Sequence, residues 1–377
     1  ADRILKKHYD GLRDVIGDRG SVFGLGGDFF LAVFGQEQVD RVSGYLTNAV
    51  IGLDDSGSRS VNLSTRTGIY IVPSEGKNLD PAEFVGKSAM AYKMAKDLDE
   101  EAVCFFDEKM GNKVVKVDKI RKDFPVALER EEFRVYYQPK VDINTGRMAG
   151  AESLCRWVKN GKVIPPGGFI EVLERTDDIC RLDFYMLEHV CMDLRRWLDE
   201  GKECPRVSVN FSRRHMSDKR FDETITRIVD KYDIPRHLIE IELTETTTDV
   251  EFADLKRVVA ALQKVGMYTA VDDFGIGYSS LKLIKDIPWN ILKVDKSFLP
   301  GEGEDLDKKT AIMYRYVVQM TKELNIKCVT EGVETVEQVR ILRENGCEIA
   351  QGYLYDRPLP VEEFESRLDG HTYEVYD

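Results

Sequence analysis

The acidic residues that stand where apolar runs end are the clearest candidates for chemistry in this chain. In YTAVDDFGIGYSS, residues 268–280, Asp272 and Asp273 stand side by side before a glycine-rich stretch. Any single carboxylate at such a position could simply cap the following helix. Five carboxylates around one site would repel one another and raise each other's pKa, so their convergence predicts bound cations. The polar residues at or near the ends of apolar runs are Glu152, Asn210, Glu242, Asp272, Asp273, Lys293, Glu331 and Gln351.

Oxygen ligands of this kind suit Mg²⁺ or Mn²⁺ rather than zinc or copper. Adjacent aspartates at a strand end can serve two neighbouring ions about 3.5 to 4 Å apart, the spacing of two-metal phosphodiester chemistry. Lys293 is a candidate for orienting or deprotonating the attacking water and for countering phosphate charge. Alternatively, it only neutralises the acidic rim.

From residue 133 onward, short β-branched or apolar runs alternate with longer segments of helical period, which is typical of βα units around a parallel sheet. The predicted strands cover residues 133–139, 148–155, 206–210, 239–243, 267–272, 290–294, 326–331 and 348–352. The predicted helices cover residues 181–200, 218–231, 250–265, 306–324 and 335–345. This α/β pattern matches a (β/α)8 barrel, whose active site lies at the carboxyl ends of the strands.

One connection departs from the parallel rule. The segment DINTGR, residues 142–147, is too short for a parallel crossover and contains an Asn-Thr-Gly turn. We therefore expect an antiparallel hairpin between the first two strands of the barrel.

Residues 1–110 form a different predicted unit of α+β type. Its expected elements are helix 2–16, a hairpin in SVFGLGGDFFLAVF, helix 36–51, strand 61–73, helix 80–98 and strand 102–106. The charged segment at 111–124 is expected to join it to a domain at 125–377.

Composition narrows the functional classes. The net charge is −13, the wrong sign for broad attraction to a nucleic-acid polymer. The seven cysteines are odd in number and show no CxxC spacing, which fits a reducing cytoplasm better than a disulfide framework. The five histidines show no paired metal-ligand spacing, so a zinc site is not expected. No apolar stretch is long enough to span a membrane.

Seven motifs occur in order: AESLCRW, SVNFS, IELTE, VDDFGIGYSS, LKVDKSF, TEGVE and AQGY. This set resembles the signature of EAL-domain cyclic di-GMP phosphodiesterases. The resemblance implies a barrel with an antiparallel first strand and hydrolysis of cyclic di-GMP to linear pGpG. It also implies two Mg²⁺ or Mn²⁺ ions per active site, inhibition by Ca²⁺, and a homodimer formed through this domain.

By motif position, the resemblance implies one metal site with four ligands: Glu152, Asn210, Glu242 and Asp272. It implies that Asp272 bridges to a second metal, held by Asp273 and aided by Glu331. Lys293 and Glu331 would then prepare the attacking water.

The same resemblance places Gln138, Arg156 and Gln351 at the substrate side of the site. It matches Glu245 to the anchor of the loop Phe274–Ser280, which couples metal binding to dimerisation in active relatives. Gly275 would permit a tight, movable backbone in this loop. The alternative is that the loop glycines only make the turn into the next helix.

Two departures fall in the EAL motifs. Ser153 replaces alanine in the namesake tripeptide, which we expect to be tolerated, and Ile276 stands where threonine is common in the loop.

Upstream, GLGGDFF followed by SAMAYKMAK is similar to the C-terminal part of a GGDEF domain. Phe29 replaces its motif glutamate, Gly24 replaces the preceding arginine, and Gly17 and Gly20 occupy the inhibitory-site positions. We expect a truncated, degenerate, non-catalytic unit with a regulatory role.

The main alternative function is a non-catalytic cyclic di-GMP receptor that uses the same cleft. A sugar-phosphate barrel enzyme is a weaker alternative, since TEGVET and AQGYLYD do not resemble phosphate loops. Because the chain begins with alanine and has no signal-like segment, we expect it to be part of a longer cytoplasmic protein, which could carry a membrane anchor upstream.

Overall fold

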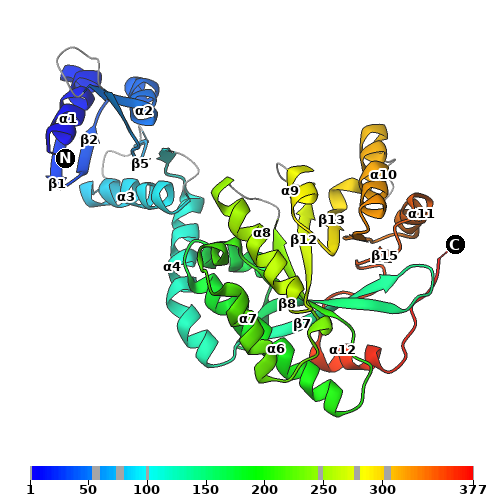
Figure 1. Ribbon diagram of the computed structural model, residues 1–377. Coiled ribbons are helices and arrows are strands. Elements are labelled where there is room, and N and C mark those ends of the chain that lie inside the picture. The colour runs from blue at the N-terminus through cyan, green and yellow to red at the C-terminus, as the bar shows by residue number, and fades with distance from the viewer. Residues whose placement is uncertain are drawn as a thin grey trace. The chain divides into compact units, whose positions relative to one another are not determined.

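The computed structural model describes residues 2–52, 60–73, 80–98, 102–244, 249–275, 281–300 and 307–376. The chain divides into two compact units, Ala1–Lys122 and Asp123–Asp377 (Figure 1). Among the helices in these ranges, none combines the length and the apolar composition that crossing a membrane requires.

Within its described residues, the first unit places helices α1, α2 and α3 and three two-stranded sheets around a small core. The expected hairpin forms between β1 and β2. The apolar side of α1 supplies Leu12 and Ile16 to the core, and α2 supplies Val42 and Leu46. In chain order, the elements are α1 (Asp2–Ile16), β1 (Ser21–Gly26), β2 (Phe29–Val33), α2 (Val39–Thr47), β3 (Ala49–Gly52), β4 (Ser60–Leu63), β5 (Thr67–Ile69), α3 (Pro81–Leu98) and β6 (Val103–Phe105).

Two element boundaries in this unit differ from the prediction. The helix expected over residues 36–51 ends at Thr47, because the β-branched run at 49–52 pairs with β4 instead. The strand expected over 61–73 is two strands, β4 and β5, separated by Ser64–Arg66. The hydroxyl of Thr65 in this break donates a hydrogen bond to the Leu46 carbonyl (2.6 Å). Before the break the chain pairs with β3, and after it the chain pairs with β6.

A single helix, α4 (Glu108–Glu129), contains the boundary between the two units. The segment 111–124, expected to join the domains, is therefore helical. At its end, the fully buried ring of Phe124 packs on Phe133, with ring centroids 5.6 Å apart.

The second unit is a closed barrel of eight strands. Around the barrel the order is β7, β8, β10, β11, β12, β13, β14 and β15, and β15 closes on β7. All neighbours are parallel except β7, which runs antiparallel to both β8 and β15. The strands are β7 (Phe133–Asp142), β8 (Met148–Lys159), β10 (Val207–Phe211), β11 (Ile239–Thr244), β12 (Tyr268–Phe274), β13 (Ile291–Val294), β14 (Lys327–Thr330) and β15 (Ile349–Ala350).

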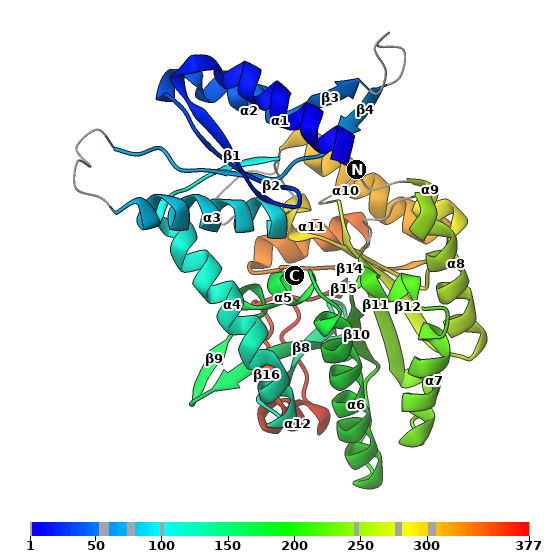
Figure 2. The same ribbon diagram turned by 90° about the vertical axis from the view of Figure 1, so that its left-hand side faces the viewer.

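Helices cover the outside of this barrel, with α6, α7 and α8 along β10 to β12 (Figure 2). Short strands β9 (Lys162–Ile164) and β16 (Leu359–Pro360) extend the sheet beside β8 and β7. The helices are α5 (Ile170–Leu173), α6 (Asp178–Asp199), α7 (Phe221–Lys231), α8 (Asp249–Lys264), α9 (Leu281–Asp286), α10 (Lys308–Glu323), α11 (Val336–Asn345) and α12 (Val361–Leu368).

The predicted fold class is confirmed, including the antiparallel first strand. All eight predicted strands and all five predicted helices of this unit are present, with ends shifted by a few residues. The helices α5, α9 and α12 were not predicted, because segments of four to eight residues are too short to show a helical period.

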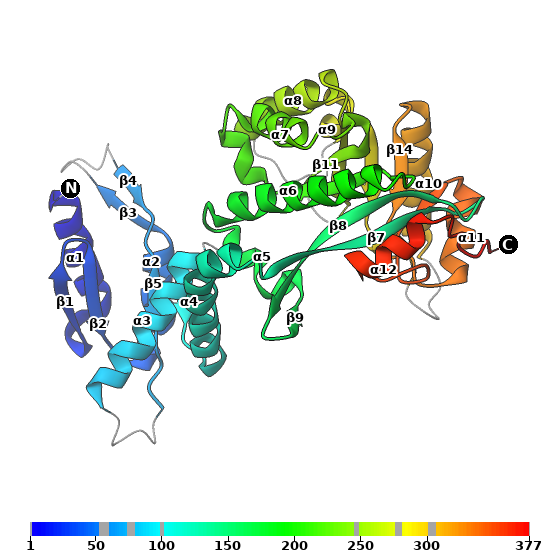
Figure 3. The ribbon, with the colours of Figure 1, turned by 90° about the horizontal axis from the view of Figure 1, so that it is seen from below.

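The alternation of side chains along β7 decides what enters the barrel. Tyr137 points outward, where its ring packs against Trp197 of α6 and Phe364 of α12. Figure 3 shows α6 and α12 beside β7. Its neighbours Gln138 and Lys140 therefore point into the barrel, toward the polar residues of the other strands.

Candidate active site

Lys293 lies at the centre of the candidate site. It stands on β13, and its side chain is only 1% exposed. Its Nζ lies 2.7 Å from Glu242 Oε2, 2.8 Å from Glu331 Oε1, 3.0 Å from Asp272 Oδ1 and 3.3 Å from Glu152 Oε2. Four of the predicted acidic residues thus converge on one ammonium group at the carboxyl ends of the strands.

The strand β11 brings its acids inward by simple alternation. In IEIEL, Ile239, Ile241 and Leu243 are buried on one face, and Glu240 and Glu242 lie on the other. Both glutamates accept hydrogen bonds from Lys140 Nζ, at 2.7 and 2.8 Å. Both faces of β11 are therefore buried, and the ammonium group of Lys140 compensates the charge of the two inward-facing glutamates.

A bulge in β12 explains how two adjacent aspartates serve one site. Adjacent side chains of a regular strand point to opposite faces. Here Val271 pairs with Leu292 and Phe274 with Val294, so Asp272 and Asp273 stand opposite the single residue Lys293. Asp273 has a φ of 56°, and its N–H donates to Asp272 Oδ1 (2.9 Å). This two-against-one arrangement breaks the alternation.

With that break, the acids form two overlapping sets. Oxygens of Glu152, Glu242 and Asp272 lie within 4.8 Å of one another, and so do oxygens of Asp272, Asp273 and Glu331. Asp272 is the member common to both sets.

Two amide side chains orient Glu152, and a third holds one of them. Asn210 Nδ2 donates to Glu152 Oε1 (2.7 Å), and Gln351 Nε2 donates to Glu152 Oε2 (2.6 Å) and to Gln138 Oε1 (3.1 Å). Gln138 in turn donates to the Asp356 carbonyl (3.0 Å). The buried Oε1 of Gln351 accepts no hydrogen bond from the described part of the chain. This network ties the amides to a single carboxylate orientation.

Burial and neighbouring charges give the acids of the site different pKa values. Burial raises the pKa of Glu152 and Asp272, and the ammonium of Lys293 only partly offsets it. Burial raises the pKa of Glu331 to about 8. The negative charge of Asp272 adds to this rise, and the positive charge of Lys293 opposes it. Burial also acts on Glu242, but two ammonium groups overcome it and hold its pKa at about 2.

Lys293 remains an ammonium group. Burial alone would lower its pKa, but Asp272, Glu152 and Glu242 raise it well above the ordinary value. The group therefore acts in this arrangement as a cation and a hydrogen-bond donor.

The donor set fits hard divalent cations. Every candidate ligand offers a carboxylate or amide oxygen, the preferred donors for Mg²⁺ and Mn²⁺. The raised pKa values of Glu152, Asp272 and Glu331 show that the two buried ammonium groups do not compensate all of the negative charge. A divalent cation would supply the missing compensation.

The remaining predicted residues lie at the edge of this cluster or outside the described ranges. Arg156 lies four residues after Glu152 on β8, with its guanidinium 5.6 Å from the Tyr136 ring. Phe274 is buried, and Gly275 has a φ of 110° with Phe298 so close that a Cβ would lie 2.1 Å from its ring. Glu245 and Ile276 lie outside the described residues.

Two buried charged residues beside the site, Lys140 and Glu240, were not predicted. The signal that identifies them is spacing by two. Lys140 follows Gln138 by two residues, and Glu240 precedes Glu242 by two residues, so each shares the inward face of its strand.

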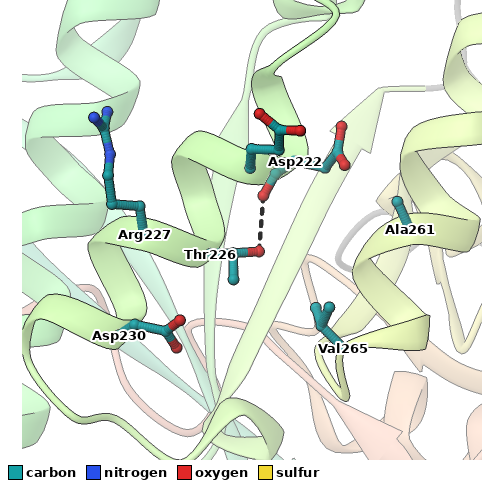
Figure 4. A pocket seen from close by; sticks show the side chains of 7 residues that line it. Asp222, Thr226, Arg227, Asp230, Ala261 and Val265 are labelled. Carbon is teal, nitrogen blue, oxygen red and sulfur yellow. Dashed lines mark hydrogen bonds between the residues drawn. The ribbon is translucent and has the colours of Figure 1, made fainter.

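The barrel unit also has a surface groove that lies apart from the site. A groove of about 420 Å³ lies between α7 and α8 (Figure 4). None of the predicted site residues lines it. Its lining residues are Asp222, Glu223, Thr226, Arg227, Asp230, Ala261 and Val265.

The fold and the site together define a (β/α)8 barrel whose mouth is acidic and whose oxygen donors suit divalent cations. The protein-family model described as "EAL domain" matches residues 121–358. The chain belongs to the EAL-domain family, as the motifs predicted.

Several relatives carry functional names. The chain is 31% identical over 372 residues to the signaling protein YkoW of Bacillus subtilis, covering 97% of this chain and 46% of YkoW. It is 31% identical over 369 residues to the bifunctional diguanylate cyclase/cyclic di-GMP phosphodiesterase MucR of Pseudomonas aeruginosa, covering 96% of this chain and 53% of MucR. The chain thus spans about half the length of these relatives.

A solved structure shows the same barrel. The PaMucR phosphodiesterase in complex with c-di-GMP superposes with a TM-score of 0.61 at 32% identity, covering 65% of this chain and 99% of that chain. An EAL-domain protein from Listeria monocytogenes EGD-e gives a TM-score of 0.55 at 31% identity, covering 64% of this chain and 94% of that chain.

Proposed function

We propose that this protein is a cyclic di-GMP phosphodiesterase that hydrolyses its substrate to linear 5'-pGpG. The observation that carries the proposal is the convergence of Glu152, Glu242, Asp272 and Glu331 on Lys293 at the mouth of an EAL barrel. Relatives named as cyclic di-GMP phosphodiesterases, such as PA2567 of Pseudomonas aeruginosa at 32% identity, support the choice of substrate.

Two Mg²⁺ or Mn²⁺ ions complete this proposal. Asp272 would be shared between the two ion sites, which agrees with its membership of both oxygen sets. Such ions lower the pKa of a bound water and counter phosphate charge. We expect Ca²⁺ to occupy the site and inhibit. The ligands would be Glu152, Asn210, Glu242 and Asp272 for one ion, and Asp272, Asp273 and Glu331 for the other.

The chain's own residues then carry out the reaction. Glu331, once ionised, accepts the proton of the attacking water, and the Lys293 ammonium orients that water by donating to its oxygen. The water oxygen bonds to phosphorus as the bond from phosphorus to the ribose 3'-oxygen breaks. The departing 3'-oxygen takes a proton from solvent, which leaves a 3'-hydroxyl and a 5'-phosphate. Arg156 and Gln138 would hold the substrate, and Gln351 would keep Glu152 in orientation.

Incubation with cyclic di-GMP and Mn²⁺, followed by chromatography for pGpG, tests the assignment. We expect turnover by the wild type and its loss in Glu152→Gln and Lys293→Ala, since each removes several kcal/mol of barrier lowering. Lys159→Met, in a partly exposed ion pair with Asp123, is the control. Near-normal rates in both site variants would contradict the roles, and tight binding without turnover in the wild type would favour the receptor alternative.

The remaining parts of the proposal concern regulation. We propose that the first unit is a degenerate GGDEF domain without cyclase activity, because Phe29 stands in place of the motif glutamate. We further propose a homodimer of the barrel unit in the cytoplasm. In it, Glu245, Phe274 and Gly275 would couple dimerisation to the site.

A further inference from the structure

Lys140 lies beneath the site, and the proposed reaction assigns it no part. It comes from β7, the antiparallel strand, and its side chain is 5% exposed. Its Nζ bridges Glu240 Oε1 at 2.7 Å and Glu242 Oε1 at 2.8 Å. Glu240 is equally buried, and the side chain of Glu242 is entirely buried. The three groups form a buried ionic chain inside the barrel, with Lys140 between the two glutamates.

The two oxygens of Glu242 are divided between two lysines. Oε1 accepts from Lys140, and Oε2 accepts from Lys293, at 2.8 and 2.7 Å. Because the side chain of Glu242 is entirely buried, both of its oxygens depend on protein donors for hydrogen bonds. Lys140 is therefore the contact that fixes Glu242 Oε1 and leaves Oε2 directed toward the cluster.

We propose that Lys140 is a positioning residue that holds Glu242 in the orientation needed to bind a divalent cation. The inference rests on the proposed function, in which Glu242 is a metal ligand. Lys140 contacts neither substrate nor ion in this proposal, and Glu240 anchors it. Partners that orient metal ligands in this way commonly contribute 10- to 100-fold to metal affinity.

The direction of the effect separates positioning from simple electrostatics. A buried positive charge repels a divalent cation, so its removal alone would tighten cation binding. Loss of a positioning contact would weaken cation binding. A role confined to folding would lower stability and leave the affinity unchanged.

The test is Mn²⁺ titration calorimetry without substrate, on the full chain. Lys140→Met keeps the side-chain length and removes the charge, and we expect its Mn²⁺ Kd to rise about 10-fold or more. Lys140→Arg should rescue most of the affinity, because a cavity of about 50 Å³ lined by Lys140 and Glu240 offers room for the larger group. The KM for cyclic di-GMP at saturating Mn²⁺ should change less than twofold in Lys140→Met.

An unchanged or lower Mn²⁺ Kd in folded Lys140→Met would overturn the inference. If that variant does not fold, Glu240→Gln gives the answer instead, since it loosens Lys140 while leaving a hydrogen-bonding group; we expect a smaller rise in Kd, and no rise would overturn the inference. Lys159→Met is the matched control. A wild type that binds no Mn²⁺ would overturn the proposed function as well, whereas normal wild-type binding with unaffected variants would remove the role of Lys140 alone.

Discussion

The acidic mouth is stable because each buried carboxylate has a partner. Lys140 and Lys293 contact the innermost acids, and Asn210 and Gln351 hold Glu152. Buried ion pairs contribute little net stability against apolar packing, yet breaking one of them is costly. Their retention therefore fits a role in binding and catalysis better than a role in folding.

Cation binding should release a proton from Glu331. Its pKa of about 8 lies above the ordinary 4.5, so at pH 7 the folded, cation-free protein holds this carboxyl protonated. A cation binds the ionised form, and we expect Mn²⁺ affinity to rise as the pH increases from 6 to 8. Calorimetry in buffers of different ionisation enthalpy measures the protons released. Heats that do not depend on the buffer would contradict this prediction.

The serine in the namesake tripeptide has a structural partner. Ser153 is buried, and its hydroxyl donates to the Ser208 carbonyl of β10 (2.7 Å). We expect Ser153→Ala to lower the free energy of unfolding by about 1 kcal/mol and to leave turnover within about twofold. Urea unfolding and the pGpG assay measure the two effects. Ser217→Ala, at an exposed hydroxyl, is the control, and equal losses in both variants would contradict the argument.

At this scale, the position of a residue at the end of an apolar run predicted the site. Glu152, Asn210, Glu242 and Lys293 were singled out because they end apolar runs, and the structure brings them together. Lys140 and Glu240 lie one pleat deeper, where no strand ends. Lys140 and Glu240 are buried only once the barrel closes, so the pattern within a single strand does not predict their burial.

At the scale of elements, the bulge in β12 places demands on its backbone. Asp273 adopts a left-handed φ of 56°, which suits glycine and is costly for alanine. In cation-free buffer, we expect the free energy of unfolding of Asp273→Ala to be about 1 kcal/mol lower than that of Asp273→Gly. Urea unfolding measures the difference. Both variants lose the carboxylate, so the comparison isolates the backbone. Equal stability of the two variants would contradict a left-handed residue here.

Element positions followed from periodicity, but irregularities did not. The hairpin after β7 was predicted from the turn residues in DINTGR, and the structure contains it. The bulge was not predicted, because Asp272 and Asp273 read equally well as the end of a regular strand. Similarly, the end of α2 depends on pairing between β3 and β4, a tertiary contact that overrides local helix propensity.

At the scale of the whole molecule, helix α4 supplies part of the barrel's packing. Phe124 is fully buried against Phe133, and Asp123 pairs with Lys159 at 2.7 Å. We expect a fragment covering 108–377 to be more stable than one covering 125–377, by on the order of 3 kcal/mol. Urea unfolding followed by circular dichroism compares the two. Equal midpoints would show that the domain needs nothing before residue 125.

The barrel was predictable as a whole because its strands and helices alternate with regular lengths, as between residues 206 and 345. The first unit was less predictable, since its strands are three to six residues long and β5 pairs with β6 on the far side of α3. Short strands carry little periodicity, so their boundaries depend on partners that only the folded chain supplies.

The reversed direction of β7 also decides where the barrel can be attached to something else. Because β7 begins at the mouth and runs toward the opposite end, Phe133 pairs with Trp157 beyond the acidic mouth. The turn at Gly146 lies at the opposite end of the barrel. The last described residues return to that turn, where the Tyr373 N–H donates to the Gly146 carbonyl (2.8 Å). Figure 3 shows the C-terminus beside the end of the β7–β8 hairpin. A fluorescent reporter or a sensor-chip tether fused after Tyr376 would therefore be attached at the end of the barrel opposite the acidic mouth.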